Sequence, residues 1–213
     1  MSKIKAVIFD MDGVLIDAKD WHYEALNQAL ELFGYKISRY DHLVTFDGLP
    51  TKKKLEMLTI EKGLPKGLHK FINHMKQIYT MEHVYMKCKP LFCHQYALSK
   101  LKNEGYMVIL ISASPEFYIK EFYAIKEVDL IIGTKFIFEN GKFVRKMSGN
   151  NCKGEEKVKR LEKVLKEKNI KADFKNSYMF SDSLSDKPLL DLVGNPYLIN
   201  YKKHNKFEIL KWK

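Results

Sequence analysis

Short apolar runs that end in polar residues recur along this chain, and the first of them is Ala6-Val7-Ile8-Phe9. An uninterrupted apolar run of this length is typical of a strand buried on both faces, as in a parallel sheet. It leads directly into Asp10-Met11-Asp12-Gly13, where the glycine permits a sharp turn. The motif alone also fits an ordinary turn. Because open parallel sheets bind ligands at the carboxyl ends of their strands, the two carboxylates lie where chemistry is expected.

The next segment has helical rather than strand periodicity. Apolar residues recur at helical spacing in three stretches, at residues 21–33, 51–60 and 65–79. No convincing strand lies among them. We therefore expect residues 17–88 to form a helical insert that interrupts the rest of the chain.

From residue 90 onward, predicted strands and helices alternate. Apolar runs predict strands at 107–111, 129–132, 178–180 and 197–199, and helical spacing predicts helices at 91–103, 116–125, 154–168 and 204–212. Glu139-Asn140-Gly141 separates two further short runs and predicts a hairpin. This alternation predicts an α/β fold, with a mostly parallel sheet covered on both faces, formed by residues 1–16 and 89–213.

The composition is that of a globular protein, with 46% hydrophobic and 13% aromatic residues in a chain of 213. No apolar stretch is long enough to span a membrane. Asp10 and Asp12 interrupt any signal-peptide core, so we expect a cytoplasmic protein without a membrane partner. The three cysteines, Cys88, Cys93 and Cys152, form no disulfide framework or zinc pattern and are interpreted as ordinary thiols.

The net charge of +11 arises from 37 basic and 26 acidic residues. A charge of this size can indicate nucleic-acid binding. However, only Arg39, Arg145 and Arg160 are arginines, and arginine is the better bidentate reader of phosphate and guanine. We therefore expect a solvated lysine-rich surface that attracts small anionic substrates rather than nucleic acid.

Polar side chains suited to phosphoryl transfer follow three of the predicted strands. Asp10 and Asp12 follow the first, Ser112 follows the second, and Asp182 and Asp186 follow a later one. Ser112 also precedes a predicted helix, whose free N–H groups can bind an anion. Crowded carboxylates repel one another unless a cation neutralises them. Carboxylates with other oxygen ligands at one sheet edge suit Mg²⁺.

Two lysines, Lys153 and Lys157, lie at the start of the predicted helix at 154–168, from where they could reach an anion. Taken singly, these residues have ordinary explanations: a helix N-cap for Ser112, a solvated surface for Lys153 and a turn for residues 182–186. Their occurrence in this order, close to the ends of predicted strands, favours one common site.

The order of these motifs resembles that of the haloacid dehalogenase superfamily of phosphohydrolases. The resemblance is carried by Phe9-Asp10-Met11-Asp12-Gly13-Val14-Leu15, Ile111-Ser112-Ala113-Ser114, Asn151-Cys152-Lys153-Gly154-Glu155-Glu156-Lys157 and Ser181-Asp182-Ser183-Leu184-Ser185-Asp186. It implies a Rossmann-like core with a helical cap inserted after the first motif, where residues 17–88 lie. It also implies a Mg²⁺-dependent phosphomonoesterase that acts on a small phosphorylated metabolite through an aspartyl-phosphate intermediate.

The resemblance further implies a role for each matching residue. Asp10 attacks phosphorus, and Asp12 protonates the leaving oxygen and then activates water. Ser112 and the backbone amide of Ala113 hold phosphate oxygens. The metal ligands are the carboxylates of Asp10 and Asp182 and the backbone carbonyl of Asp12.

The phosphate-binding lysine has two candidates. Lys153 matches the pattern of some phosphoserine phosphatases, and Lys157 matches relatives that lack the first lysine. We take Lys153 as the catalytic and phosphate-binding lysine, with Lys157 as the alternative one helical turn away. Asp186 would orient the lysine or the metal shell.

The two halves of the chain resemble different branches of the superfamily. Residues 1–88 resemble sugar-phosphate phosphatases and β-phosphoglucomutase, whereas residues 107–200 resemble phosphoserine phosphatases. Three alternatives therefore stay open: a sugar phosphomutase, a natural or engineered chimera with the fold but little activity, and a nucleic-acid-binding protein. Thr51 follows Pro50 near the point where a mutase-like cap would place an arginine, which weakens the mutase alternative. Neither the substrate nor the oligomeric state can be read from the sequence.

Overall fold

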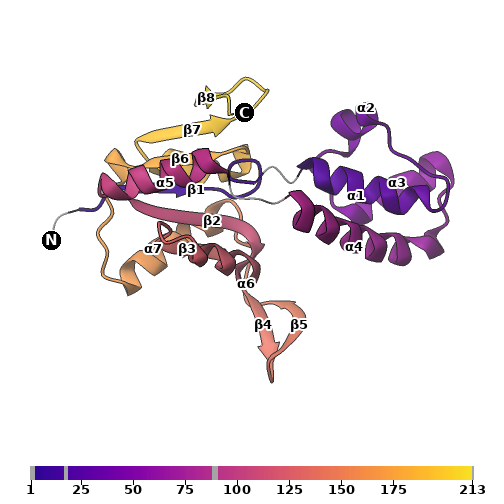
Figure 1. Cartoon of the computed structure of the whole chain (residues 1–213), viewed down its shortest axis with the longest axis horizontal. Coiled ribbons are helices and arrows are strands. Elements are labelled where there is room, and N and C mark those ends of the chain that lie inside the picture. The colour runs from indigo at the N-terminus through magenta and orange to yellow at the C-terminus, as the bar shows by residue number, and fades with distance from the viewer. Residues whose placement is uncertain (1–2, 17–18, 88–90, 213) are drawn as a thin grey trace. The chain divides into compact units, whose positions relative to one another are not determined.

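The computed structural model describes residues 3–16, 19–87 and 91–212, which fall into two compact units (Figure 1). The first unit comprises Met1–Asp17 and Pro90–Lys213, and the second comprises Ala18–Lys89. Each boundary lies one residue from the position expected from the sequence. Cys88, expected to be an ordinary thiol, lies outside the described residues.

A six-stranded sheet forms the centre of the first unit, with strand order β3-β2-β1-β6-β7-β8 (Figure 1). Every neighbouring pair is parallel, which confirms the expected α/β class. Since β1 lies between β2 and β6, its carboxyl end opens at the middle of the sheet edge. The bounds are β1 Ala6–Phe9, β2 Met107–Pro115, β3 Leu130–Thr134, β6 Tyr178–Ser181, β7 Asn195–Ile199 and β8 Glu208–Leu210.

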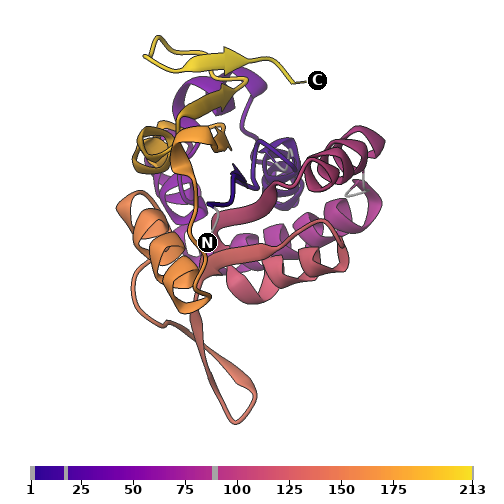
Figure 2. The ribbon, with the colours of Figure 1, turned by 90° about the vertical axis from the view of Figure 1, so that its left-hand side faces the viewer.

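Helices cover both faces of this sheet. Alternate strand residues point to opposite sides, and because both sets are apolar, each face is packed against helices. Ile8 and Ile109 pack in a cluster with residues of α7 (Glu155–Glu167) and α8 (Lys187–Leu192). Val7 and Val108 pack in a second cluster with residues of α5 (Phe92–Asn103) and α6 (Glu116–Ile119). Figure 2 shows α5 and α7 on opposite sides of the strands. Burial of each such aliphatic side chain contributes about 1.5–3 kcal/mol, which explains the uninterrupted apolar run of β1.

Strand β2 continues beyond its predicted end at residue 111 and is irregular there. Ile111 pairs with Ile132 and Pro115 pairs with Thr134, so between these pairs three residues of β2 lie opposite one residue of β3. The extra residues make this part of β2 a bulge, which bends the strand and frees its backbone groups from regular pairing. Residues 112–114 thus form the irregular end of β2, at the carboxyl edge of the sheet.

Two peripheral elements of the first unit test the sequence predictions. The expected hairpin is confirmed as the antiparallel pair β4 (Phe136–Glu139) and β5 (Lys142–Met147). The helix expected at 204–212 is wrong, because this segment contains β8, which pairs with β7 at the edge of the sheet. Phe207 packs with one face of the core, and Leu210 and Trp212 pack with the other. That alternation has the period of a strand rather than of a helix.

The remaining elements of the first unit are short. The helix expected at 116–125 is α6 followed by a 3-10 turn, η3 (Lys120–Ala124). Two further 3-10 turns, η4 (Phe174–Asn176) and η5 (Leu184–Asp186), flank β6. The second of these turns leads directly into α8, and it places Asp186 at the sheet edge.

The described part of the second unit contains helices and no strands. Its helices are α1 Lys19–Glu31, α2 Arg39–Asp41, the π-helix η1 His42–Phe46, α3 Thr51–Lys62, the 3-10 turn η2 Lys66–Leu68 and α4 His69–Lys87. Helices α1 and α4 pack along each other, and Leu26, Leu30, Leu58 and Ile72 are central to a separate hydrophobic core. Within the described ranges of the chain, no helix is long and apolar enough to cross a membrane.

Candidate active site

The turn after β1 brings three aspartates together. Asp10 extends the sheet by one hydrogen bond, because its N–H donates to the carbonyl oxygen of Phe180 at 2.9 Å. Gly13 has a φ of +77°, and a Cβ at this position would collide with Oδ2 of Asp182. Only glycine therefore leaves room for the Asp182 carboxylate beside the turn that carries Asp10 and Asp12.

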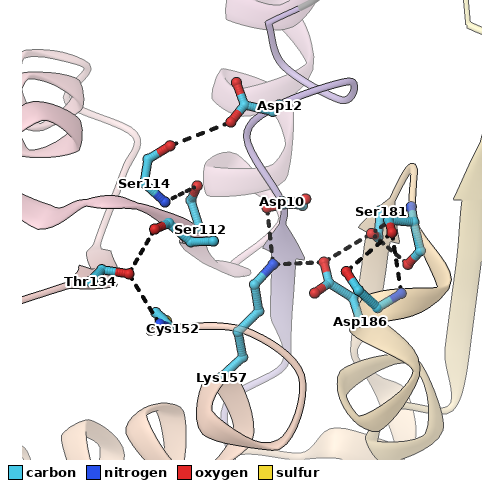
Figure 3. A network of polar contacts seen from close by, with 12 residues as sticks. Asp10, Asp12, Ser112, Ser114, Thr134, Cys152, Lys157, Ser181 and Asp186 are labelled. Atoms are coloured by element: carbon cyan, nitrogen blue, oxygen red, sulfur yellow. Dashed lines mark hydrogen bonds and ion pairs between the residues drawn. The ribbon is translucent and has the colours of Figure 1, made fainter. Parts of the chain in front are cut away.

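Lys157 forms the buried charged centre of the site (Figure 3). Although it lies on the charged helix α7, it is only 2% exposed. Its Nζ donates to Oδ1 of Asp10 at 3.0 Å and to Oδ2 of Asp186 at 2.6 Å. The hydroxyl of Ser181 donates to the same Asp186 oxygen at 2.9 Å. A buried ammonium group is costly unless it is paired, so the two carboxylates account for its position.

Burial and neighbouring charges shift the pKa values of Asp10, Asp12 and Lys157. It raises the pKa of Asp10 to about 7, with Asp186 adding to the shift and Lys157 opposing it. Burial also raises the pKa of Asp12, although the hydrogen bond from Ser114 lowers it. For Lys157, burial lowers the pKa, but Asp10 and Asp186 outweigh burial and the net shift is upward. The lysine therefore stays cationic, and Asp12 is suited to hold and release a proton.

The irregular end of β2 supplies the hydroxyl groups of the site. Ser112 is 2% exposed, and its Oγ accepts a hydrogen bond from the N–H of Ser114 at 3.1 Å. The proton of the Ser112 hydroxyl is therefore available to another acceptor, such as a phosphate oxygen. The Ser114 hydroxyl donates to Oδ2 of Asp12 at 3.4 Å and so links the two loops.

Asp10, Ser112 and Lys157 line one pocket of about 170 Å³, which lies within the first unit. Asp182 does not line it but packs against Gly13. Lys153 is exposed and lines the pocket from the loop before α7, whereas Lys157 is the lysine bonded to Asp10. These contacts give no support to the preference for Lys153. The lining residues are Asp10, Asp12, Ser112, Ala113, Lys153, Lys157, Ser185 and Asp186.

Ser181, Ser185 and Thr134 are among the residues of this region that were given no role from the sequence. Ser181 holds Asp186, and Ser185 lines the pocket. Thr134 ends β3, and its Oγ1 lies 2.7 Å from the carbonyl oxygen of Ala113. A polar residue at the end of an apolar run is the signal that singled out Asp10, and the same signal was present for Thr134 at the end of residues 130–134.

The oxygen donors beside the turn fit a hard divalent cation. The Asp182 carboxylate lies against Gly13, which follows Asp10 and Asp12 in the same turn, so two carboxylates and the backbone carbonyl of Asp12 are available near this turn. Among residues 3–16, 19–87 and 91–212, no cluster of three or more aspartate, glutamate, histidine or cysteine side chains forms a metal site by itself. Mg²⁺ needs no such cluster, since it commonly takes one or two carboxylates and completes its shell with water and phosphate oxygens.

The fold and the pocket together define a class of protein: a parallel α/β protein with aspartate, serine and lysine side chains at the carboxyl edge of its sheet. The chain belongs to the haloacid dehalogenase-like hydrolase family, whose family model matches residues 7–191. The resemblance drawn from the sequence motifs is thereby confirmed.

Individual relatives agree with this membership. Phosphoserine phosphatase of Archaeoglobus fulgidus is 20% identical over 200 residues, which are 93% of this chain and 53% of that protein. The chain thus spans about half the length of that relative. A candidate β-phosphoglucomutase of Thermotoga maritima superposes with a TM-score of 0.70 at 18% identity, over 98% of this chain and 94% of that one. A candidate phosphoglycolate phosphatase of Lactobacillus delbrueckii superposes with a TM-score of 0.65 at 18% identity, over 99% of this chain and 95% of that one. At these identities the two structures show a shared fold.

Proposed function

We propose that the chain is a Mg²⁺-dependent phosphomonoesterase that acts on a small phosphorylated metabolite through an aspartyl-phosphate. The observation that carries this proposal is the contact of Lys157 with Asp10 and Asp186 beside a pocket lined by Ser112 and Ala113. A cation, a hydroxyl and a backbone segment thus surround the carboxylate that would attack phosphorus. The phosphatase named among the relatives supports the same reaction class.

In the first step, a carboxylate oxygen of Asp10 forms a bond to phosphorus while the bond from phosphorus to the leaving oxygen breaks. Asp12 gives its proton to that oxygen, a task that suits a carboxyl group whose pKa is raised by burial. Ser112 donates to a phosphate oxygen, and a lysine neutralises the charge that spreads over these oxygens. Lys157 is the better placed lysine for this role, since it already contacts Asp10.

In the second step, Asp12, now ionised, takes a proton from water. The water oxygen bonds to phosphorus, and the bond between phosphorus and Asp10 breaks. Orthophosphate leaves, and both aspartates return to their starting states. Asp10, Asp182 and the carbonyl of Asp12 would hold Mg²⁺, which when bound supplies charge neutralisation for the phosphoryl group.

The helical unit, residues 18–89, would act as the cap that selects the substrate. Its own hydrophobic core makes it able to move as a body, which supports this role. The substrate class is a small phosphate monoester, in keeping with a pocket of about 170 Å³ and a net charge of +11. Cytoplasmic location stays a prediction.

The alternatives drawn from the sequence are separated by simple observations. A phosphomutase would convert a hexose 1-phosphate to its isomer, whereas a phosphatase would release orthophosphate. A chimera of two branches of this family would also match one family model, so turnover tests this alternative: a chimera with the fold but little activity would hydrolyse phosphomonoesters poorly.

Replacement of Asp10 tests the proposal. Asp10→Asn should lower turnover of p-nitrophenyl phosphate by more than about a thousandfold, because the amide is a poor nucleophile. Acid-quenched wild type should carry a phosphoryl group on the peptide that contains Asp10. Asp191→Asn is the matched control: it removes a carboxylate paired with Lys187 and Lys206, which do not line the pocket, and should leave turnover within about twofold. Undiminished hydrolysis in Asp10→Asn would reject the proposed mechanism.

A further inference from the structure

The hydroxyl of Thr134 lies between the two loops that carry the phosphate-facing groups. Thr134 is the last residue of β3 and is 1% exposed. Its Oγ1 lies 2.7 Å from the carbonyl oxygen of Ala113 and 3.1 Å from Oδ1 of Asn151, and it accepts from the N–H of Cys152 at 3.0 Å (Figure 3). One side chain thus contacts both the bulge of β2 and the loop that leads to Lys153.

A hydroxyl group has a single proton and can donate to one acceptor at a time. The carbonyl oxygen of Ala113 is the nearer of the two acceptors, so we assign the proton to it. Ala113 lies in the bulge, where β2 has lost its regular register with β3. The side chain of Thr134 therefore provides a hydrogen-bond donor for the Ala113 carbonyl group, which lies in the bulge where regular strand pairing is lost.

The consequence for the pocket follows from peptide geometry. The carbonyl group of Ala113 and the N–H of Ser114 belong to one planar unit and point in opposite directions. Thr134 holds the carbonyl end, and the N–H end donates to Oγ of Ser112 at 3.1 Å. With this oxygen occupied as an acceptor, the Ser112 hydroxyl is directed to use its proton on another partner. The orientation of Ser112 is thus coupled to Thr134 through a single peptide plane.

We propose that Thr134 is a positioning residue of the phosphate pocket, which fixes the Ala113–Ser114 peptide and through it the donor direction of the Ser112 hydroxyl. This inference rests on the proposed function for its catalytic meaning. Its physical content is narrower: removal of one hydroxyl loosens two backbone segments and weakens the binding of orthophosphate.

A pair of substitutions separates the hydroxyl from the shape of the side chain. Thr134→Val keeps the β-branched shape, which suits a strand, and removes the hydroxyl, whereas Thr134→Ser keeps the hydroxyl. Thr134→Val should weaken orthophosphate binding, measured by calorimetry, by about tenfold, the effect of one lost hydrogen bond. It should also accelerate amide hydrogen exchange at Cys152 and Ser114. Thr134→Ser should recover most of both properties.

A control for general destabilisation is provided by Ser177. Its buried hydroxyl accepts from the N–H of Ala6 at 2.9 Å and donates to the carbonyl of Asp173 at 2.7 Å, so it also bridges two backbone segments. It precedes β6 and therefore lies at the amino edge of the sheet, opposite the pocket. Ser177→Ala should lower the melting temperature and leave orthophosphate binding unchanged.

A double-mutant cycle tests the route through Ser112. In the background of Ser112→Ala, Thr134→Val should produce less than about a threefold further loss of orthophosphate affinity, because the group it orients is gone. Fully additive losses, unchanged amide exchange in Thr134→Val, or failure of Thr134→Ser to recover binding would each overturn the inference.

If wild type binds orthophosphate but hydrolyses no phosphomonoester, the proposed function fails and the positioning role stands. If it binds no orthophosphate, the role of Thr134 in the pocket is rejected.

Discussion

Replacement of Lys157 by methionine should destabilise the first unit far more than replacement of a surface lysine. The substitution keeps an unbranched side chain of similar length and removes the charge. Lys157 contacts Asp10 at 3.0 Å and Asp186 at 2.6 Å, and the side chains of these aspartates are 13% and 1% exposed. Methionine would therefore leave two carboxylates without their shared cation in a poorly hydrated place.

The size of the effect follows from this burial. Breaking a buried ion pair from one side costs about 3–5 kcal/mol. Asp10 has a pKa of about 7 and can take up a proton when the lysine is lost, which limits its share of the penalty. We therefore expect the lower end, about 3 kcal/mol, which corresponds to a fall of about 6–12 °C in melting temperature for a unit of this size.

Urea unfolding and calorimetry in metal-free buffer measure this loss. Lys153→Met is the matched control, because Lys153 is exposed, and it should cost less than about 0.5 kcal/mol. In the background of Lys157→Met, Asp186→Asn should recover about 1–2 kcal/mol, since it removes one unneutralised charge. A loss below about 1 kcal/mol in Lys157→Met, or equal losses for both lysines, would refute the account of Lys157 as the buried charge centre.

Three further changes test other parts of the structure. Gly13→Ala should lower the free energy of unfolding by more than about 1 kcal/mol, because the φ of Gly13 is positive. The new Cβ would also displace Asp182, so the variant should need a higher Mg²⁺ concentration for activity, which assays at varied Mg²⁺ measure. His22 is exposed, but partial desolvation and the charges of Lys76 and Lys54 lower its pKa from 6.5 to about 4, so the folded state binds the proton more weakly than the unfolded chain. Stability should therefore fall as pH decreases from about 6.5 toward 4, and His22→Gln should reduce that fall in urea titrations. Maleimide should modify exposed Cys93 in the folded protein. Cys152 is buried and its pKa is raised to about 11, so maleimide should modify it only after unfolding. Peptide mass analysis of folded and unfolded samples measures both reactions.

The central strands could be predicted from sequence because burial on both faces demands apolar residues at every position. Residues 6–9 meet this condition, and all four are buried. The edge strand β8 lacks this signal, since a three-residue strand at an edge has only one neighbour to pair with. The alternation of Phe207 with Leu210 and Trp212 between the two faces was available, but a short segment rich in apolar residues also fits a helix.

The candidate site was predictable where a polar residue ends an apolar run. Asp10, Asp12 and Ser112 were found in this way, and the structure brings them to one pocket. The preference for Lys153 came from motif position alone. Lys157 lies one and two helical turns before Leu161 and Leu165, on the face of α7 that packs against the sheet, whereas Lys153 lies in the loop before this helix. The helical spacing of the apolar residues was therefore the signal that could have singled out Lys157.

The contact between Lys157 and Asp10 joins residues that are 147 positions apart in the chain. The segment closed by this contact includes the whole helical unit. Contacts of such high sequence separation are slow to form, because the closure entropy must be paid before the contact stabilises anything. The charge centre should therefore be assembled after the rate-limiting step of folding. In stopped-flow experiments, Lys157→Met should accelerate unfolding and leave the refolding rate nearly unchanged.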